Sequence, residues 1–89
     1  MQIETIIKSL ADPTRLRIMR LLAAMELAVG ELAQVLEQSQ PRVSRHVGIL
    51  CDAGLAERRR EGSWVFLHTP TVAEDNARLD AIIHLLATA

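Results

Sequence analysis

The 89-residue sequence contains one cysteine, four glycines and no apolar run of the length that would span a lipid bilayer. A single cysteine permits no internal disulfide, so we expect the protein to fold in the reducing cytoplasm. The first residues lack the pattern of a secretory signal peptide, and internal repeats and low-complexity tracts are missing as well. Export, membrane insertion and repeat architectures are therefore not expected.

The sequence also lacks the patterns that catalysis would need. Its serines have no base at the spacing of a known motif, and its glycines are dispersed instead of being gathered in a phosphate-binding loop. We therefore expect neither an enzymatic activity nor a cofactor.

An amphipathic helix is predicted over about residues 40–52. Ser39 is suited to cap its first turn, and Pro41 stands where a missing amide hydrogen costs nothing. Apolar residues recur at helical spacing and must face a core. They are Val43, Val47 and Leu50.

The remaining surface of this helix carries side chains suited to nucleic acid. Arginine pairs bidentately with guanine and glutamine with adenine, while serine bonds a base or a phosphate. These side chains cluster in the first turns, the end that a recognition helix inserts into the major groove. The candidate DNA contacts are Gln40, Arg42, Ser44, Arg45 and His46. The alternative for the whole face is ordinary solvation, and for the histidine it is a bond to local backbone.

A β-hairpin is predicted over about residues 55–68, after a glycine C-cap at Gly54. Three arginines precede a Glu61-Gly62 turn, and a run rich in aromatic and β-branched residues follows it. Glu57 and Glu61 cannot neutralise all three arginines, so we expect them to meet a polyanion, for which phosphate is the simplest candidate. The arginines are Arg58, Arg59 and Arg60.

The charge distribution agrees with a polyanionic partner. Residues 39–62 carry five arginines and three acids, a net charge of +2, whereas the rest carries five bases and eight acids, a net charge of −3. Positive charge is thus concentrated on the proposed DNA surface, although the formal net charge of the chain is −1.

A helical scaffold is predicted around these two parts. Asp12 is suited to cap a second helix with Pro13 at its first position. Residues 29–36 predict the positioning helix of a helix-turn-helix, with its turn at Glu37 and Gln38.

Both terminal helices, predicted over about residues 3–10 and 71–87, are apolar. A chain this small buries only a modest fraction of its surface, so we expect these helices to form the seam of a homodimer. The expected seam residues are Ile3, Ile6, Ile7, Leu79, Ile82, Ile83 and Leu86. For each of them, a role in the core of one subunit is the alternative.

Three segments in unbroken order resemble the ArsR/SmtB-type winged helix-turn-helix repressors of bacteria. They are SLADPTRLRIMRLL at 9–22, ELAVGELAQVLEQSQPRVSRHVGIL at 26–50 and CDAGLAERRREGSWVFLH at 51–68. The resemblance implies a homodimeric DNA-binding domain that represses its own operon until an inducer is sensed. Within the family, the chain is most similar to regulators whose winged-helix domain precedes a methyltransferase-like domain.

The usual metal sites of that family are not reproduced. Where the resemblance places two cysteines of a thiolate site, this chain has Ala28 and Gly30, which offer no ligand atoms. Asp75, Asp80 and His84 stand in the last predicted helix, but not at the Asp-x-His spacing of the alternative zinc site. We therefore expect no metal site.

The sequence thus predicts a single domain over residues 1–89, mostly α with a small β-hairpin, in the form of a dimeric winged helix-turn-helix. Its expected function is sequence-specific binding of double-stranded DNA as a cytoplasmic transcriptional repressor whose inducer is unknown. Cys51 is interpreted as a small packing residue, with a sensing role as the alternative. Two other functions stay open: the N-terminal DNA-binding domain of a longer regulator with a methyltransferase-like domain, and a protein-interaction module on a winged-helix scaffold.

Overall fold

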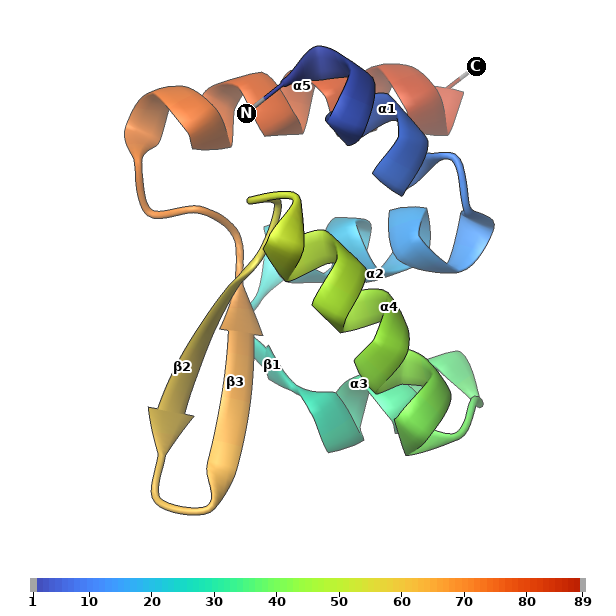
Figure 1. Ribbon diagram of the computed structural model, residues 1–89, viewed down its shortest axis with the longest axis vertical. Helices are drawn as coiled ribbons and strands as arrows, with labels where there is room; N and C mark the ends of the chain where they lie inside the picture. Colours follow the sequence, from blue (N-terminus) through green and yellow to red (C-terminus); the bar gives the residue numbers. More distant parts are fainter. Residues whose placement is uncertain (1, 89) are drawn as a thin grey trace.

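The computed structural model describes residues 2–88, which form a winged helix-turn-helix of five helices and three strands (Figure 1). The elements are α1 (Ile3–Leu10), α2 (Pro13–Ala24), β1 (Leu27–Ala28), α3 (Val29–Leu36), α4 (Gln40–Asp52), β2 (Glu57–Glu61), β3 (Trp64–His68) and α5 (Ala73–Thr88). Helices α3 and α4 are the helix-turn-helix, and the β2–β3 hairpin is the wing. In Figure 1, α1 and α5 lie at the end of the molecule opposite the wing tip. None of the helices within residues 2–88 is long and apolar enough to cross a membrane.

Helices α2 and α4 both begin at a side chain that satisfies free backbone amides. The Asp12 carboxylate accepts hydrogen bonds from the amides of Thr14 at 2.8 Å and Arg15 at 3.2 Å. Ser39 Oγ accepts one from the amide of Arg42 at 3.4 Å. A proline occupies the first turn of each helix. Both predicted N-caps are therefore confirmed.

The two turns around α4 use the left-handed backbone region. Gly54 has a φ of 78°, and the amide of Leu55 donates to the carbonyl of Leu50 at 2.9 Å, which closes the end of α4 as predicted. Between α3 and α4, Glu37 has a φ of 55° and is the non-glycine residue with positive φ among residues 2–88. These turns set the angle at which α4 leaves α3 and the direction in which the chain enters the wing.

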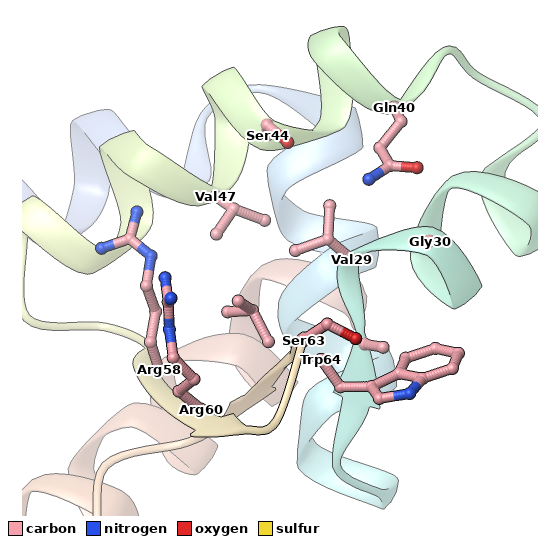
Figure 2. Close-up of a pocket in the computed structure, with 11 residues that line it drawn as sticks. Val29, Gly30, Gln40, Ser44, Val47, Arg58, Arg60, Ser63 and Trp64 are labelled. Atoms are coloured by element: carbon pink, nitrogen blue, oxygen red, sulfur yellow. The ribbon is translucent and has the colours of Figure 1, made fainter.

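A third strand, β1, is present that the sequence does not predict. It pairs antiparallel with β3, with Leu27 opposite Leu67, and gives the sheet the order β1-β3-β2. Two residues are too few to show the alternation by which strands are recognised. The strand joins the wing to the helical body, and a groove remains between the wing and α4 (Figure 2).

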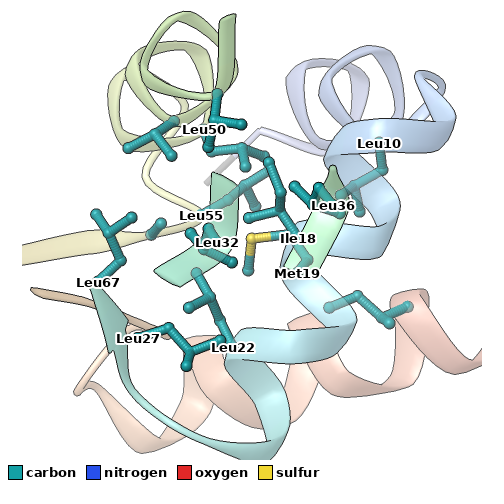
Figure 3. Packing of buried hydrophobic residues seen from close by; sticks show 14 of the residues in the cluster. Leu10, Ile18, Met19, Leu22, Leu27, Leu32, Leu36, Leu50, Leu55 and Leu67 are labelled. Carbon is teal, nitrogen blue, oxygen red and sulfur yellow. The ribbon is translucent and has the colours of Figure 1, made fainter. Parts of the chain in front are cut away.

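The hydrophobic core fills the space between the helices and the inner face of the sheet (Figure 3). Its fully buried side chains include Ile18, Met19, Leu32, Leu50, Leu55 and Leu67. The predicted inward stripe of α4 is confirmed, because Val43 and Leu50 are 0% exposed and Val47 is 2% exposed. The opposite face of α4 is consequently left at the surface.

The residues predicted for a dimer seam fall into two groups in the subunit. The buried group packs in the core of the subunit itself and comprises Ile6, Leu79 and Ile83. Ile82 and Leu86 are partly buried against the same core, whereas Ile3 is 56% and Ile7 is 52% exposed. Leu85, which was not among the predicted residues, is 69% exposed on α5. Fewer of the predicted seam residues are therefore exposed to a partner than the sequence suggested.

The cap of α2 predicts a pH-dependent contribution to stability. Burial raises the pKa of Asp12, but the amide hydrogen bonds from Arg15 and Thr14 outweigh it and the pKa is lowered from its ordinary value. The contribution of the cap is thus present above the unfolded-state pKa of about 4 and is lost as the pH falls through the folded-state pKa. Asp12→Ala should lower the free energy of unfolding by about 1 kcal/mol at neutral pH, and this difference should shrink in acid.

Urea denaturation at a fixed protein concentration over a pH series measures this difference. Asp12→Asn is the matched control, because the amide keeps an acceptor oxygen but does not titrate, so most of the stability should remain without the pH dependence. A penalty for Asp12→Ala that stays constant into acid would contradict the prediction.

Candidate nucleic-acid interface

The groove between α4 and the wing has a volume of about 790 Å³ (Figure 2). Its walls come from two parts of the chain that are distant in sequence, and its floor comes from the β1–α3 junction. The lining residues are Ala28, Val29, Gly30, Gln40, Ser44, Val47, Arg58, Arg60, Ser63, Trp64 and Val65. The structure therefore brings the predicted recognition helix and the predicted wing to one concave surface.

Helix α4 presents its predicted polar residues to the outside. Gln40, Arg42, Ser44 and Arg45 are all exposed, and Gln40 and Ser44 line the groove. Neither arginine of this set forms an ion pair with any residue in the range 2–88. Their guanidinium groups are therefore available to an external anion.

His46 differs from the other predicted contacts of α4, because it is partly buried and has a partner inside the protein. Its Nδ1 lies 3.3 Å from Nη1 of Arg15, and the Nε–H of Arg15 donates to the carbonyl of Ser9 at 2.6 Å. The partner belongs to α2, whereas the sequence suggested a phosphate or a local backbone group. The imidazole thus lies in a contact that connects α4 to α2 and to the end of α1.

The wing arginines separate onto the two faces of the hairpin. In the antiparallel register, Arg58 is opposite the buried Leu67 and Arg60 is opposite Val65, so these two arginines lie on the face that borders the groove. Arg59 is opposite Phe66 and lies on the other face. Arg58 and Arg60 form no ion pair within the described part of the chain.

Arg59 is neutralised by two acids. Its Nε and Nη2 donate to the two carboxylate oxygens of Glu26 at 3.1 and 2.7 Å, and its Nη1 donates to Glu61 at 2.7 Å. The hydrogen bonds from Arg59 lower the pKa of Glu26, and the same bonds raise the pKa of Arg59. The sequence suggested Glu57 and Glu61 as the acids near the wing and missed Glu26, which is 33 residues from Arg59 in the chain.

Two further residues of the groove were missed by the sequence analysis. Ser63 and Trp64 follow the glycine of the wing turn and border the groove at the wing tip, where Trp64 belongs to the Phe66 face of the hairpin and is 59% exposed. Trp64 stacks on Phe66 with ring centroids 6.2 Å apart and an interplanar angle of 19°. A large aromatic residue directly after an exposed turn was the signal in the sequence that could have marked this position.

The residues considered as metal ligands do not form a cluster of three within residues 2–88. Asp80 and His84 line a groove between α2 and α5 together with Arg20, whose fixed positive charge disfavours a second cation there. Within residues 2–88, no three His, Cys, Asp or Glu side chains stand together as a metal site would require. Cys51 is partly buried, and this burial raises the pKa of its thiol, which lowers the fraction of reactive thiolate.

Comparisons with known proteins agree with this architecture. Residues 12–58, from the cap of α2 into β2, match the family described as "Bacterial regulatory protein, arsR family". The chain is 49% identical over 59 residues to the "Arsenical resistance operon repressor" of Escherichia coli (strain K12), a match that covers 65% of this chain and 50% of the repressor. It is 36% identical over 84 residues to the "Transcriptional activator HlyU" of Vibrio cholerae, covering 94% of this chain and 77% of the activator.

Among solved structures, the fold is similar to a homodimeric winged helix-turn-helix DNA-binding domain from Mycobacterium bovis, a possible ArsR-family transcriptional regulator. The TM-score is 0.82 at 34% sequence identity, and the match covers 97% of this chain and 78% of that one. The chain spans between 50% and 63% of the length of the curated relatives that match it first. Because the family match extends over more than half of the sequence and the fold agrees with it, the chain belongs to the arsR family of bacterial regulatory proteins.

Proposed function

We propose that this chain is a sequence-specific DNA-binding transcriptional regulator that acts as a repressor in the bacterial cytoplasm. The observation that carries the proposal is the groove, where the exposed polar face of α4 meets two wing arginines that form no ion pair among residues 2–88. Side chains suited to base edges and side chains suited to phosphates then border one surface.

In this proposal α4 enters the major groove and the wing follows the adjacent backbone. Gln40, Arg42, Ser44 and Arg45 project from the first turns of α4, which is the part of a recognition helix that reaches base edges. Arg58 and Arg60 provide phosphate contacts, which contribute affinity without sequence preference. His46 and Arg59 were also predicted as DNA contacts, and in the structure their side chains contact Arg15 and Glu26 of the same chain.

Repression is favoured over activation by the pattern of relatives. The Escherichia coli relative, named a repressor, is 49% identical to the chain, whereas the Vibrio cholerae relative, named an activator, is 36% identical over a longer segment.

We further propose that the chain acts as a homodimer through α1 and α5. Ile3, Ile7 and Leu85 are exposed on these two helices, and an apolar surface at the end opposite the wing tip is suited to a second copy. The similar domain from Mycobacterium bovis is homodimeric. Two copies would place two α4 helices on successive half-sites of an operator.

The two alternatives from the sequence have less support. A protein-interaction module has less support because the groove walls carry two arginines without an ion pair among residues 2–88, together with Gln40 and Ser44, a set that suits a polyanion. A longer regulator with a methyltransferase-like domain stays a prediction, which the reading frame of the gene tests directly.

The division of labour between α4 and the wing can be measured by single substitutions. Arg45→Ala should weaken binding by about 1–3 kcal/mol where it reads a base, and should relax the preference at that position of the operator. Arg60→Ala should instead weaken binding to all duplexes and reduce the slope of log K against log salt by about one.

The probe is a fluorescent duplex that the wild-type chain selects from a random library, titrated at several salt concentrations beside point variants of that duplex. Loss of discrimination in Arg60→Ala with an unchanged salt slope would reverse the two assignments.

The proposed seam can be tested without disturbing the core. Ile7→Asp places a charge on an exposed apolar side chain of α1, so it should dissociate the dimer while the subunit stays folded. Val35→Asp is the matched control, since Val35 is 51% exposed on α3, outside the proposed seam, and should leave assembly unchanged. Sedimentation equilibrium reports the mass and circular dichroism reports the fold. An Ile7→Asp protein that remains a dimer would remove α1 from the seam.

Regulation by metal is not expected in this domain. Cys51 alone supplies too few ligands for a closed site, and Asp80 and His84 share their groove with Arg20. Zinc or arsenite should therefore leave the affinity for the selected duplex nearly unchanged. The measurement is DNA binding with and without each of them, repeated with Cys51→Ser. Stoichiometric metal binding coupled to release of DNA would contradict the prediction, and loss of that response in Cys51→Ser would identify the thiol as the sensor.

A further inference from the structure

The outer face of the wing carries a layered contact of Arg59, Phe66 and Trp64. The guanidinium carbon of Arg59 lies 4.8 Å from the centroid of the Phe66 ring, and Trp64 stacks on the same ring. Arg59 and Phe66 are direct partners in the β2–β3 register. The arginine therefore lies over β3 instead of extending away from the hairpin.

Beyond Phe66, Arg59 reaches the far edge of the sheet. The strand order is β1-β3-β2, and Glu26 immediately precedes β1, so the bond joins β2 to the start of a strand about 10 Å away on the other side of β3. Their bond is bidentate, with two parallel N–H donors on two carboxylate oxygens, and Glu61 holds the third guanidinium nitrogen. One side chain thus ties all three strands together.

Such a pair has an orientational role that isolated surface ion pairs lack. Exposed ion pairs contribute little to stability, except where the geometry is bidentate or several charges form a network, and both conditions hold here. Strand pairing between the wing and the helical body is short, because β1 pairs with β3 at only two positions, Leu27 with Leu67 and Ala28 with Phe66. Strand β2 is paired with β3 up to the turn, so the distal hairpin would move as a unit relative to the helical body, and the bond from Arg59 to Glu26 restrains that movement.

We propose that Glu26 and Arg59 are positioning residues for DNA binding, whose bidentate pair holds the wing against β1 so that Arg58 and Arg60 face α4. This inference rests on the proposed function of the groove. Arg59 acts through its neighbours on the strand, and Glu26 promotes binding to a polyanion although it is itself an anion.

The test is whether removal of this acid weakens or strengthens DNA binding. Removing an acid from a DNA-binding protein ordinarily strengthens binding, because it reduces repulsion from phosphate. Glu26→Gln leaves one carbonyl oxygen to accept from the charged guanidinium and puts an amide NH2 donor in place of the second acceptor, so it should weaken binding to the selected duplex by roughly three- to tenfold. Glu37→Gln is the matched control, because Glu37 is exposed in the helix-turn-helix turn without an ion pair among residues 2–88, and should leave affinity equal or slightly higher.

A spectroscopic readout follows the wing without DNA. Trp64 is the only tryptophan of the chain and stacks on the ring that Arg59 covers. Glu26→Gln and Arg59→Ala should each lower the fluorescence anisotropy of Trp64 and increase its quenching by acrylamide, with unchanged helical circular dichroism. Arg58→Ala, the neighbouring arginine on the other face, should leave the fluorescence as in the wild type. In the Arg59→Ala background, Glu26→Gln should cause no further loss of DNA affinity, since the two residues act as one unit.

The proposal is overturned if Glu26→Gln binds DNA as tightly as the wild type or more tightly, if the two substitutions have additive effects, or if the Trp64 signal does not change. If the wild-type chain binds no duplex in a salt-dependent manner, the proposed function fails. The fluorescence of the free protein then still decides whether the pair holds the wing.

Discussion

The burial of one stripe of α4 is the constraint on which the rest of this structure depends. Val43, Val47 and Leu50 are almost completely inaccessible, and exposing any of them would cost roughly 1.5–3 kcal/mol. A rigid helix with that stripe inside has only one possible orientation for its other residues. Gln40 and Ser44 therefore meet the groove because of hydrophobic packing, and no polar contact of their own is needed to hold them there.

In the wing, too, a buried residue fixes the orientation of the others, because side chains alternate between the two faces of a strand. Leu67 is fully buried and is paired with Leu27 on one side and Arg58 on the other, which fixes the inner face of the hairpin. Alternation then places Arg58 and Arg60 on the face of the groove and Arg59 on the outer face. Three adjacent arginines of equal charge consequently have different surroundings, and composition alone could not distinguish them.

The features that were predictable from sequence are those set by neighbours within a turn or two. The stripe of α4, the caps at Asp12 and Ser39 and the hairpin around Gly62 depend on residues a few positions apart. Two contacts could not be predicted in this way, because they join residues far apart in the chain. Glu26 and Arg59 are 33 positions apart, and Arg15 and His46 are 31 positions apart. The apolar spacing of the terminal helices likewise shows that one face is buried, but not whether the subunit's own core or a second copy buries it. In the structure, the core takes Ile6, Leu79 and Ile83.

These long-range contacts give α2 an importance that its own sequence does not suggest. Near its start, Arg15 holds the carbonyl of Ser9 at the end of α1 and contacts His46 on α4. Just beyond its end, Glu26 holds Arg59 on the wing. A helix of 12 residues is a rigid spacer of about 18 Å. Helix α4 is therefore held near one end of α2, and the wing is held near the other end. The separation between α4 and the wing is therefore set by α2 and the core behind it, although α2 itself lines no part of the groove.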